Sequence, residues 1–182
     1  MWRLLPIMAV LLVACGGGSA SPAPLASGAV TAEAIGTATG SPATWAGVVL
    51  VNRGDAPLTL SAVEPVSLDA GLRVVGIQVR ILGPDGDALG DPNPSVSGPG
   101  FPPVHHGVPV AGAVLEPVVP ADERPLAEVL VGLVADRPGR YVLRGLRIRY
   151  TVGGSDREGT LAHAVAICAT DPDDQAGDCT PP

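Results

Sequence analysis

The chain has 182 residues, 46% of them hydrophobic, which is enough for one domain with a buried core. Its net charge is −7, all 11 basic residues are arginine, and only 3% of the residues are aromatic. An acidic chain neutralises phosphate poorly and offers few rings for base stacking, so we expect no binding to nucleic acid.

The first 14 residues have the pattern of a secretory signal. Arg3 supplies the positive charge, and an apolar run from Leu4 to Val13 follows it. This run is about half of the roughly 20 residues that a membrane-spanning helix needs. We therefore predict that residues 1–14 form a signal peptide that is removed, rather than a permanent membrane span.

The signal ends in Leu12-Val13-Ala14-Cys15, an aliphatic residue, a variable one, a small one and a cysteine. This stretch resembles the lipobox of bacterial lipoproteins. The resemblance implies cleavage before Cys15 and attachment of lipid to its thiol, often with acylation of the new amino terminus. Two or more acyl chains anchor a protein stably. We expect a protein on the cell membrane that faces outside the cytoplasm, with covalent lipid at Cys15 and no other cofactor.

The rest of the chain divides by composition into three parts. Residues 15–42 are rich in Gly, Ser, Ala and Pro and poor in large side chains, which predicts a flexible tether behind the lipidated cysteine. A first strand that begins inside Val30–Ile35 is the alternative for the end of this segment. Residues 43–170 hold the apolar runs of a folded domain. Residues 171–182 form an acidic C-terminal tail.

Runs rich in Val, Leu and Ile, bounded by Gly, Pro and Asn, predict short β-strands within this domain. The clearest is a hairpin in which residues 141–152 and 160–168 flank a Gly-Gly turn. Residues 83–107 are rich in Pro and Gly and predict a long loop. The remaining predicted strands cover residues 45–51, 58–63, 72–82 and 126–135, with an edge strand at 108–119. About seven short strands without a convincing helix predict an all-β antiparallel sandwich.

Residues 136–141, just before the hairpin, read Asp-Arg-Pro-Gly-Arg-Tyr. They resemble the Asp-x-Gly-x-Tyr corner that precedes strand F of immunoglobulin-like sandwiches, with one more residue between Asp136 and Gly139. The resemblance implies an immunoglobulin-like fold over roughly residues 44–169. The inter-sheet cysteine pair of antibody domains has no counterpart in this sequence.

Cys168 and Cys179 remain once Cys15 is assigned to lipid. An even pair of cysteines in an oxidising compartment favours a disulfide. Closing a loop of about a dozen residues contributes up to roughly 3 kcal/mol in the chain-entropy model. We predict a disulfide that holds the C-terminal tail against the last strand.

The three histidines, His105, His106 and His163, suggest an alternative function. Residues 49–57 resemble the opening strand and turn of anchored bacterial copper carriers with cupredoxin-like sandwiches. Those carriers bind copper through methionine and histidine, whereas both methionines here lie in the predicted signal. Solvent-exposed loop histidines are therefore the favoured interpretation. An extracytoplasmic copper- or zinc-binding protein that uses these histidines stays the alternative.

Two surfaces are candidates for a partner. Arg147 and Arg149 lie on one face of a predicted strand, and Phe101, the only phenylalanine, lies in the long loop. We found no nucleophile elbow, isolated acidic pair or phosphate loop, so we expect no enzymatic activity. The hypothesis is a lipid-anchored protein with a structural or interaction role at the bacterial cell envelope, whose partner is an envelope protein or a cell-wall polymer.

Overall fold

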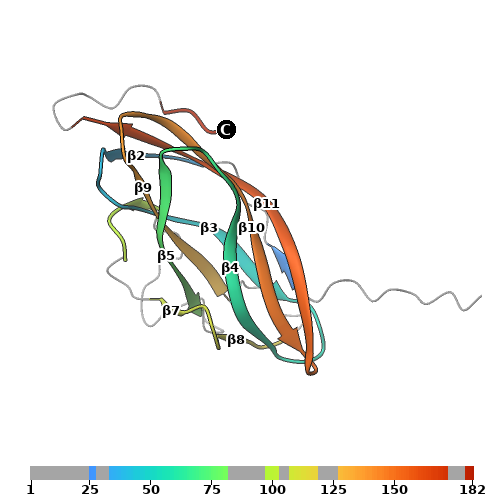
Figure 1. Ribbon diagram of the computed structural model, residues 1–182. Helices are drawn as coiled ribbons and strands as arrows, with labels where there is room; N and C mark the ends of the chain where they lie inside the picture. Colours follow the sequence, from blue (N-terminus) through green and yellow to red (C-terminus); the bar gives the residue numbers. More distant parts are fainter. Residues whose placement is uncertain (1–24, 28–32, 82–96, 103–106, 119–126, 172–178) are drawn as a thin grey trace, which may run out of the picture.

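Figure 1 shows the computed structural model, which describes residues 25–27, 33–81, 97–102, 107–118, 127–171 and 179–182. These residues form two β-sheets that pack face to face around one core. The described part of the chain contains no helix, and so no helix of the length and hydropathy that crossing a bilayer requires. The prediction of an all-β fold is confirmed.

The first sheet has the strand order β1-β3-β9-β5-β7, and β6 also pairs with β3. All of its pairs are antiparallel. Its strands are β1 (Leu25–Ser27), β3 (Ala43–Asn52), β5 (Leu72–Ile81), β6 (Gly98–Pro99), β7 (Val108–Pro109) and β9 (Ala127–Ala135).

The second sheet has the strand order β2-β11-β10-β4-β8. Its edge strand β2 runs parallel to β11, and the other pairs are antiparallel. Its strands are β2 (Glu33–Ala38), β4 (Leu58–Leu68), β8 (Val114–Leu115), β10 (Gly139–Val152) and β11 (Ser155–Thr170).

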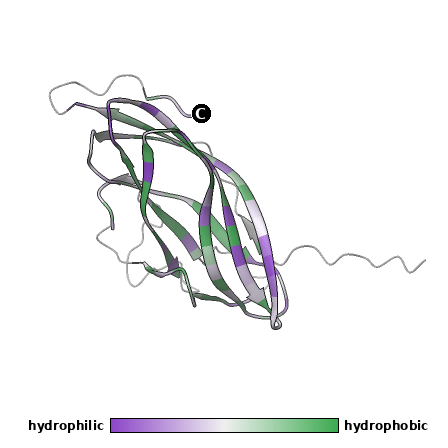
Figure 2. Cartoon of the chain, viewed as in Figure 1, coloured by the Kyte–Doolittle hydropathy of each residue, from purple (hydrophilic) through white to green (hydrophobic). Residues whose placement is uncertain are grey.

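The core is built from alternate residues of facing strands, because successive side chains of a strand point to opposite faces. In β9, Val129, Val131 and Leu133 belong to this core, and in β10, Leu146 and Ile148 do. Figure 2 shows the resulting alternation of hydrophobic and hydrophilic residues along the strands of the second sheet. The apolar pattern read from the sequence therefore sets which face of each strand is buried.

The predicted hairpin is confirmed as β10 and β11, which pair from Gly139↔Ala169 to Val152↔Ser155. The turn contains Gly153 and Gly154, with φ of 56° and 75°. Two successive residues with positive φ match the right-handed twist of paired strands, and glycine adopts that conformation without strain. The strands predicted at 45–51, 58–63, 72–82 and 126–135 are confirmed as β3, β4, β5 and β9.

The sandwich begins earlier in the chain than the sequence predicts. β1 and β2 both lie within residues 15–42, the predicted tether. A run so poor in large side chains has little drive of its own to form a strand. β2 is ordered by tertiary contacts instead, since it pairs with β11 and buries Ile35 and Thr37.

The long loop and the edge strand after it also differ from the prediction. β6 lies within residues 83–107 and pairs with β3. Residues 108–119 form two short strands rather than one, because β7 joins the first sheet and β8 the second. Pro109 and Gly112, which has a φ of 88°, interrupt the run between the two sheets. With these short edge strands, the described chain has eleven strands instead of about seven.

Candidate functional site

The corner before β10 is closed by a tyrosine. The hydroxyl of Tyr141 donates a hydrogen bond to the backbone carbonyl of Arg137, four residues upstream, at 3.1 Å. Gly71, with a φ of 93°, lies under the ring, and a Cβ there would be 3.0 Å from Tyr141 Cε1. The corner that the sequence singled out is therefore fixed by both a hydrogen bond and packing.

The C-terminal tail is attached to the hairpin at two points. A disulfide joins Cys168 in β11 to Cys179, with their Cα atoms 5.8 Å apart. The guanidinium of Arg140 donates to the backbone carbonyl of Thr180 at 3.3 Å. Residues 179–182 therefore lie against the end of the second sheet.

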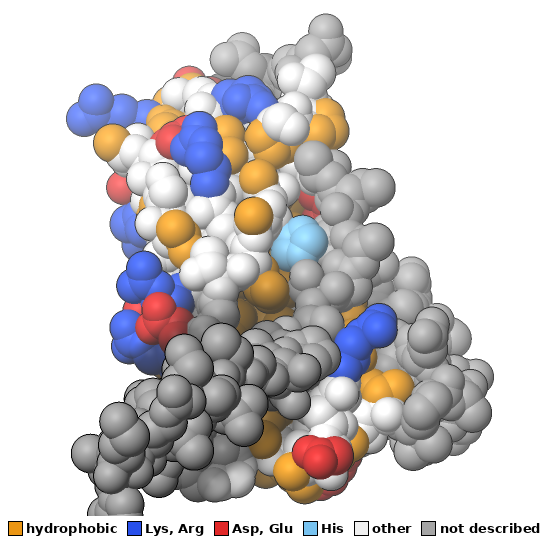
Figure 3. Space-filling model, turned by 90° about the vertical axis from the view of Figure 1, so that its right-hand side faces the viewer, with side chains coloured by type: hydrophobic (Ala, Val, Ile, Leu, Met, Phe, Trp, Pro, Cys, Tyr) orange, Lys and Arg blue, Asp and Glu red, His pale blue; other side chains and the backbone are white. Residues whose placement is uncertain are grey.

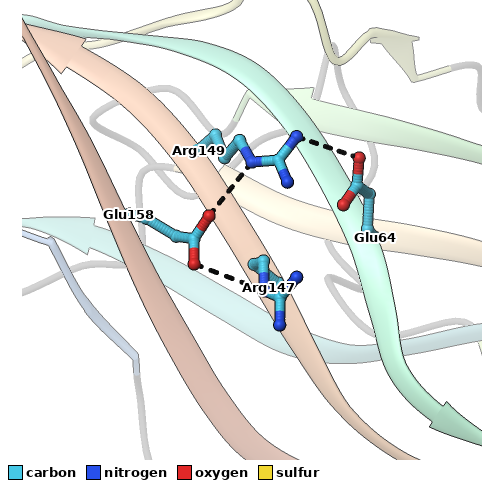
Figure 4. Close-up of polar contacts among 4 residues, drawn as sticks. All are labelled: Glu64, Arg147, Arg149 and Glu158. Atoms are coloured by element: carbon cyan, nitrogen blue, oxygen red, sulfur yellow. Dashed lines mark hydrogen bonds and ion pairs between the residues drawn. The ribbon is translucent and has the colours of Figure 1, made fainter.

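Arg147 and Arg149 belong to an ion-pair network on the outer face of the second sheet (Figure 4). Arg149 contacts Glu158 in β11 at 3.0 Å and Glu64 in β4 at 3.2 Å, and Arg147 contacts Glu158 at 3.3 Å. All four side chains are nearly half exposed. Two arginines meet two glutamates, so this network carries no net charge. On the face that Figure 3 shows, some arginines likewise lie beside acidic side chains.

Phe101, the second candidate for a partner surface, packs on the outer face of the first sheet. A Cβ placed on Gly132 in β9 would lie 2.4 Å from Phe101 Cγ, and one placed on Gly76 in β5 would lie 2.5 Å from Phe101 Cε1. The ring therefore fills a notch made by two glycines, which leaves it half-buried. The hydroxyl of Thr44 donates to the carbonyl of Gly100 and holds the same segment against the sheet.

Of the three predicted metal ligands, the structure describes one. His163 lies half-buried on β11. His105 and His106 lie outside the described residues, as does the predicted lipidation site Cys15. Within the described ranges, no three His, Cys, Asp or Glu side chains form a group that could hold a metal ion.

A buried charge pair on the first sheet was not singled out by the sequence. Arg80 in β5 and Glu128 in β9 are register partners, and Arg80 Nε donates to Glu128 Oε2 at 2.9 Å. Their side chains are only 5% and 1% exposed. Burial raises the pKa of Glu128 to about 7, against the opposing attraction of Arg80. The sequence did contain one sign of this pair, because a glutamate inside the apolar run 126–135 indicates a charge that needs a buried partner.

A groove opens at the seam where the two sheets meet. It has a volume of roughly 350 Å³ and is lined by residues 33–36 of β2 and residues 97–99 at β6. We call it the edge groove. Ser97 connects its two walls, because its hydroxyl donates to Glu33 Oε2 at 2.8 Å and accepts from the backbone N–H of Ala46 at 3.1 Å. One carboxylate is thus fixed at the groove.

Trp45 lies beside the edge groove, in the bulge where β3 changes register against β9. A Cβ placed on Gly47 would lie 2.3 Å from Trp45 Nε1 and 3.1 Å from Glu33 Oε2, so both atoms lie against this glycine. The tryptophan is completely buried, and its indole N–H has no hydrogen-bond partner. A buried donor without an acceptor is costly, which is why such groups are rare.

Comparison with models of protein families found no match for this sequence. Comparison with curated proteins found no match either. The solved structures that resemble the fold weakly include the VesB protease of Vibrio cholerae, at 9% identity and a TM-score of 0.33, and a family 123 glycoside hydrolase from Clostridium perfringens, at 12% identity and a TM-score of 0.31. The alignments cover 77% and 76% of this chain but only 32% and 22% of those proteins. Likenesses this weak carry no argument about fold or activity.

Proposed function

We propose that this chain is a lipid-anchored, extracytoplasmic interaction protein whose domain is an immunoglobulin-like sandwich. The single observation that carries the proposal is the strand order. Immunoglobulin sandwiches pair strands A, B, E and D in one sheet and C, F and G in the other. If the seven strands β1, β3, β4, β5, β9, β10 and β11 are lettered A to G along the chain, the order across the first sheet is A, B, E, D and the order across the second is C, F, G.

Two further features support this fold. β2 occupies the place of a first strand that crosses to the opposite sheet, where it runs parallel to the last strand. Tyr141 makes the backbone hydrogen bond of a tyrosine corner at the start of the strand in the F position. Sandwiches of this architecture serve as many cell-surface domains, which favours a binding role over catalysis.

Anchoring is supported by the sequence alone. The lipobox-like stretch ending at Cys15 implies a membrane-bound amino terminus, with the sandwich presented outside the cytoplasm. Intact-mass measurement of the chain isolated from bacterial membranes tests this step. Wild-type protein should begin at Cys15 and carry acyl mass, whereas Cys15→Ala should lose that mass and leave the membrane. Retention of both would contradict the anchor.

The metal-binding alternative stays a prediction with its own test. Protein purified without a histidine tag is analysed for zinc and copper, alongside a variant in which His105 and His106 are both replaced by alanine. Our proposal expects no stoichiometric metal in either sample. Stoichiometric metal in the wild type that is lost in the variant would replace the interaction role with metal binding.

A further inference from the structure

We propose that the edge groove binds a partner polypeptide in extended conformation, which lies along β2 as an added strand and places a basic side chain at Glu33. The inference rests on the proposed interaction function and names its site and its class of partner. It goes beyond the two surfaces that the sequence suggested, Phe101 and the arginine-bearing strand face.

Half of the backbone N–H and C=O groups of β2 point away from its partner strand β11. The N–H of Thr39 donates to the carbonyl of Thr170 on the β11 side. Since the polar groups of successive strand residues point to opposite sides, those of Ala34 and Gly36 point away from β11. Among the described residues, no strand pairs with this side of β2. An unpaired row of N–H and C=O groups is a template for another strand.

The edge groove provides space beside this edge of β2. The volume of roughly 350 Å³ lies at the lower end of the range of about 300–1,000 Å³ for ligand sites. Ala34, Gly36 and Gly98 line it, and a Cβ placed on either glycine would meet nothing within 4 Å. Small residues let another backbone approach closely, as strand addition requires.

The edge groove also carries a negative charge. Ser97 holds the Glu33 carboxylate at the groove, in a chain whose net charge is −7. A basic side chain complements this carboxylate. The unpartnered indole N–H of Trp45 lies against Gly47 beside the same carboxylate, so a donor brought to Glu33 changes the surroundings of the indole. Trp45 is thus a built-in reporter of occupancy.

The test uses the full-length lipoprotein in detergent and a labelled hexapeptide, Thr-Val-Arg-Val-Thr-Val. The decisive variant is Gly36→Pro, which removes the outward N–H while leaving the pairing with β11 in place. Its matched control is Gly36→Ala, which keeps the N–H and adds a Cβ in open space. Thermal unfolding by circular dichroism establishes that both variants are folded.

We expect the peptide to bind the wild type and Gly36→Ala equally, and to bind Gly36→Pro at least tenfold more weakly by fluorescence anisotropy. Replacing arginine by glutamate in the peptide should abolish binding, and Glu33→Gln should remove that preference. Cleavage before Cys15 would remove Trp2, so Trp45 would be the only tryptophan of the mature chain. Its indole resonance should then shift on binding to the wild type.

Three outcomes overturn the inference. The first is that no hexapeptide binds, and the second is that Gly36→Pro and Gly36→Ala bind it equally. The third is sedimentation as a dimer that Gly36→Pro dissociates, which would assign the edge to a second copy of this chain. None of these touches the membrane anchor or a partner captured at another surface in the native envelope. Failure of the groove is therefore distinguishable from failure of the proposed function.

Discussion

Two groups of charged residues, one on each sheet, differ in how far they are buried. On the first sheet, Arg80 and Glu128 form a register pair that is almost completely buried. On the second, Arg147, Arg149 and two glutamates form a network at the surface (Figure 4). The buried pair loses hydration that its mutual attraction must offset, whereas the exposed network keeps most of its hydration and gains little.

The difference in burial limits what each group of charges can bind. In the exposed network Arg147 and Arg149 are paired with two glutamates, so these two arginines offer little to an anionic partner. The buried pair is sensitive to the loss of either member, because breaking an ion pair in an apolar setting is costly. The edge of β2 differs from both groups, because its outward N–H and C=O groups pair with no described strand. This is why we propose that a partner binds there.

The largest expected effect is the loss of one member of the buried pair. Glu128→Leu should lower the free energy of unfolding by about 3–5 kcal/mol at pH 8, because it leaves the Arg80 guanidinium buried without its carboxylate. Urea denaturation measures this change. The double variant Arg80→Met/Glu128→Leu should recover most of the loss. A double variant as unstable as the single one would show that the pair itself is not the cause.

The same pair predicts a pH dependence. The folded state holds the proton of Glu128 up to its raised pKa of about 7, while the unfolded state releases it near the ordinary value of 4.5. Between these values the folded state binds more protons, so stability falls as the pH rises. The slope from Glu128 is at most about 1.4 kcal/mol per pH unit. Urea titrations at several pH values should show it in the wild type, and an equal slope in Glu128→Leu would contradict the assignment.

The glycine notch under Phe101 predicts a smaller effect. Gly132→Ala places a methyl group 2.4 Å from Phe101 Cγ and should cost about 1–3 kcal/mol through overpacking. Adding Phe101→Ala should relieve the clash. The double variant should therefore lose less free energy of unfolding than the sum of the losses in the two single variants. Purely additive losses would mean that the ring does not occupy the notch in solution.

The smallest effect is expected at the exposed network. Glu158→Gln removes the carboxylate shared by Arg147 and Arg149 and should cost only about 0.2–1 kcal/mol. The loss should shrink further in 1 M salt, where screening is strong. A loss as large as that of Glu128→Leu would erase the contrast between the two sheets.

The long strands were predictable from the sequence because periodicity alone specifies them. β5, β9 and the β10–β11 hairpin carry alternating or continuous apolar runs, and Gly153-Gly154 marks the turn. β2 was predictable only as an alternative, a strand start inside Val30–Ile35, since its Ala, Gly and Thr residues become a strand only when β11 is beside them. Local sequence does not encode such tertiary support.

The candidate sites also divide into those that local sequence predicts and those that depend on tertiary contacts. The corner at Tyr141 could be read from residues close together in the chain. The Arg80–Glu128 pair joins residues 48 apart, and the edge groove joins β2 to residues more than 60 positions away. Such proximity depends on the register and the strand order, which the sequence pattern left open. The missed sites are therefore those that exist only in the folded sandwich.

The most direct test of the account is site-specific photo-crosslinking in the native bacterial envelope. A photoreactive residue is placed at Ala34 in the edge groove and, as a control, at Arg149 in the exposed network. We predict that position 34 crosslinks to a partner, that the arginine hexapeptide competes this product away, and that its glutamate analogue does not. Crosslinks from position 149 alone, or products at position 34 that ignore the peptide, would contradict binding along β2.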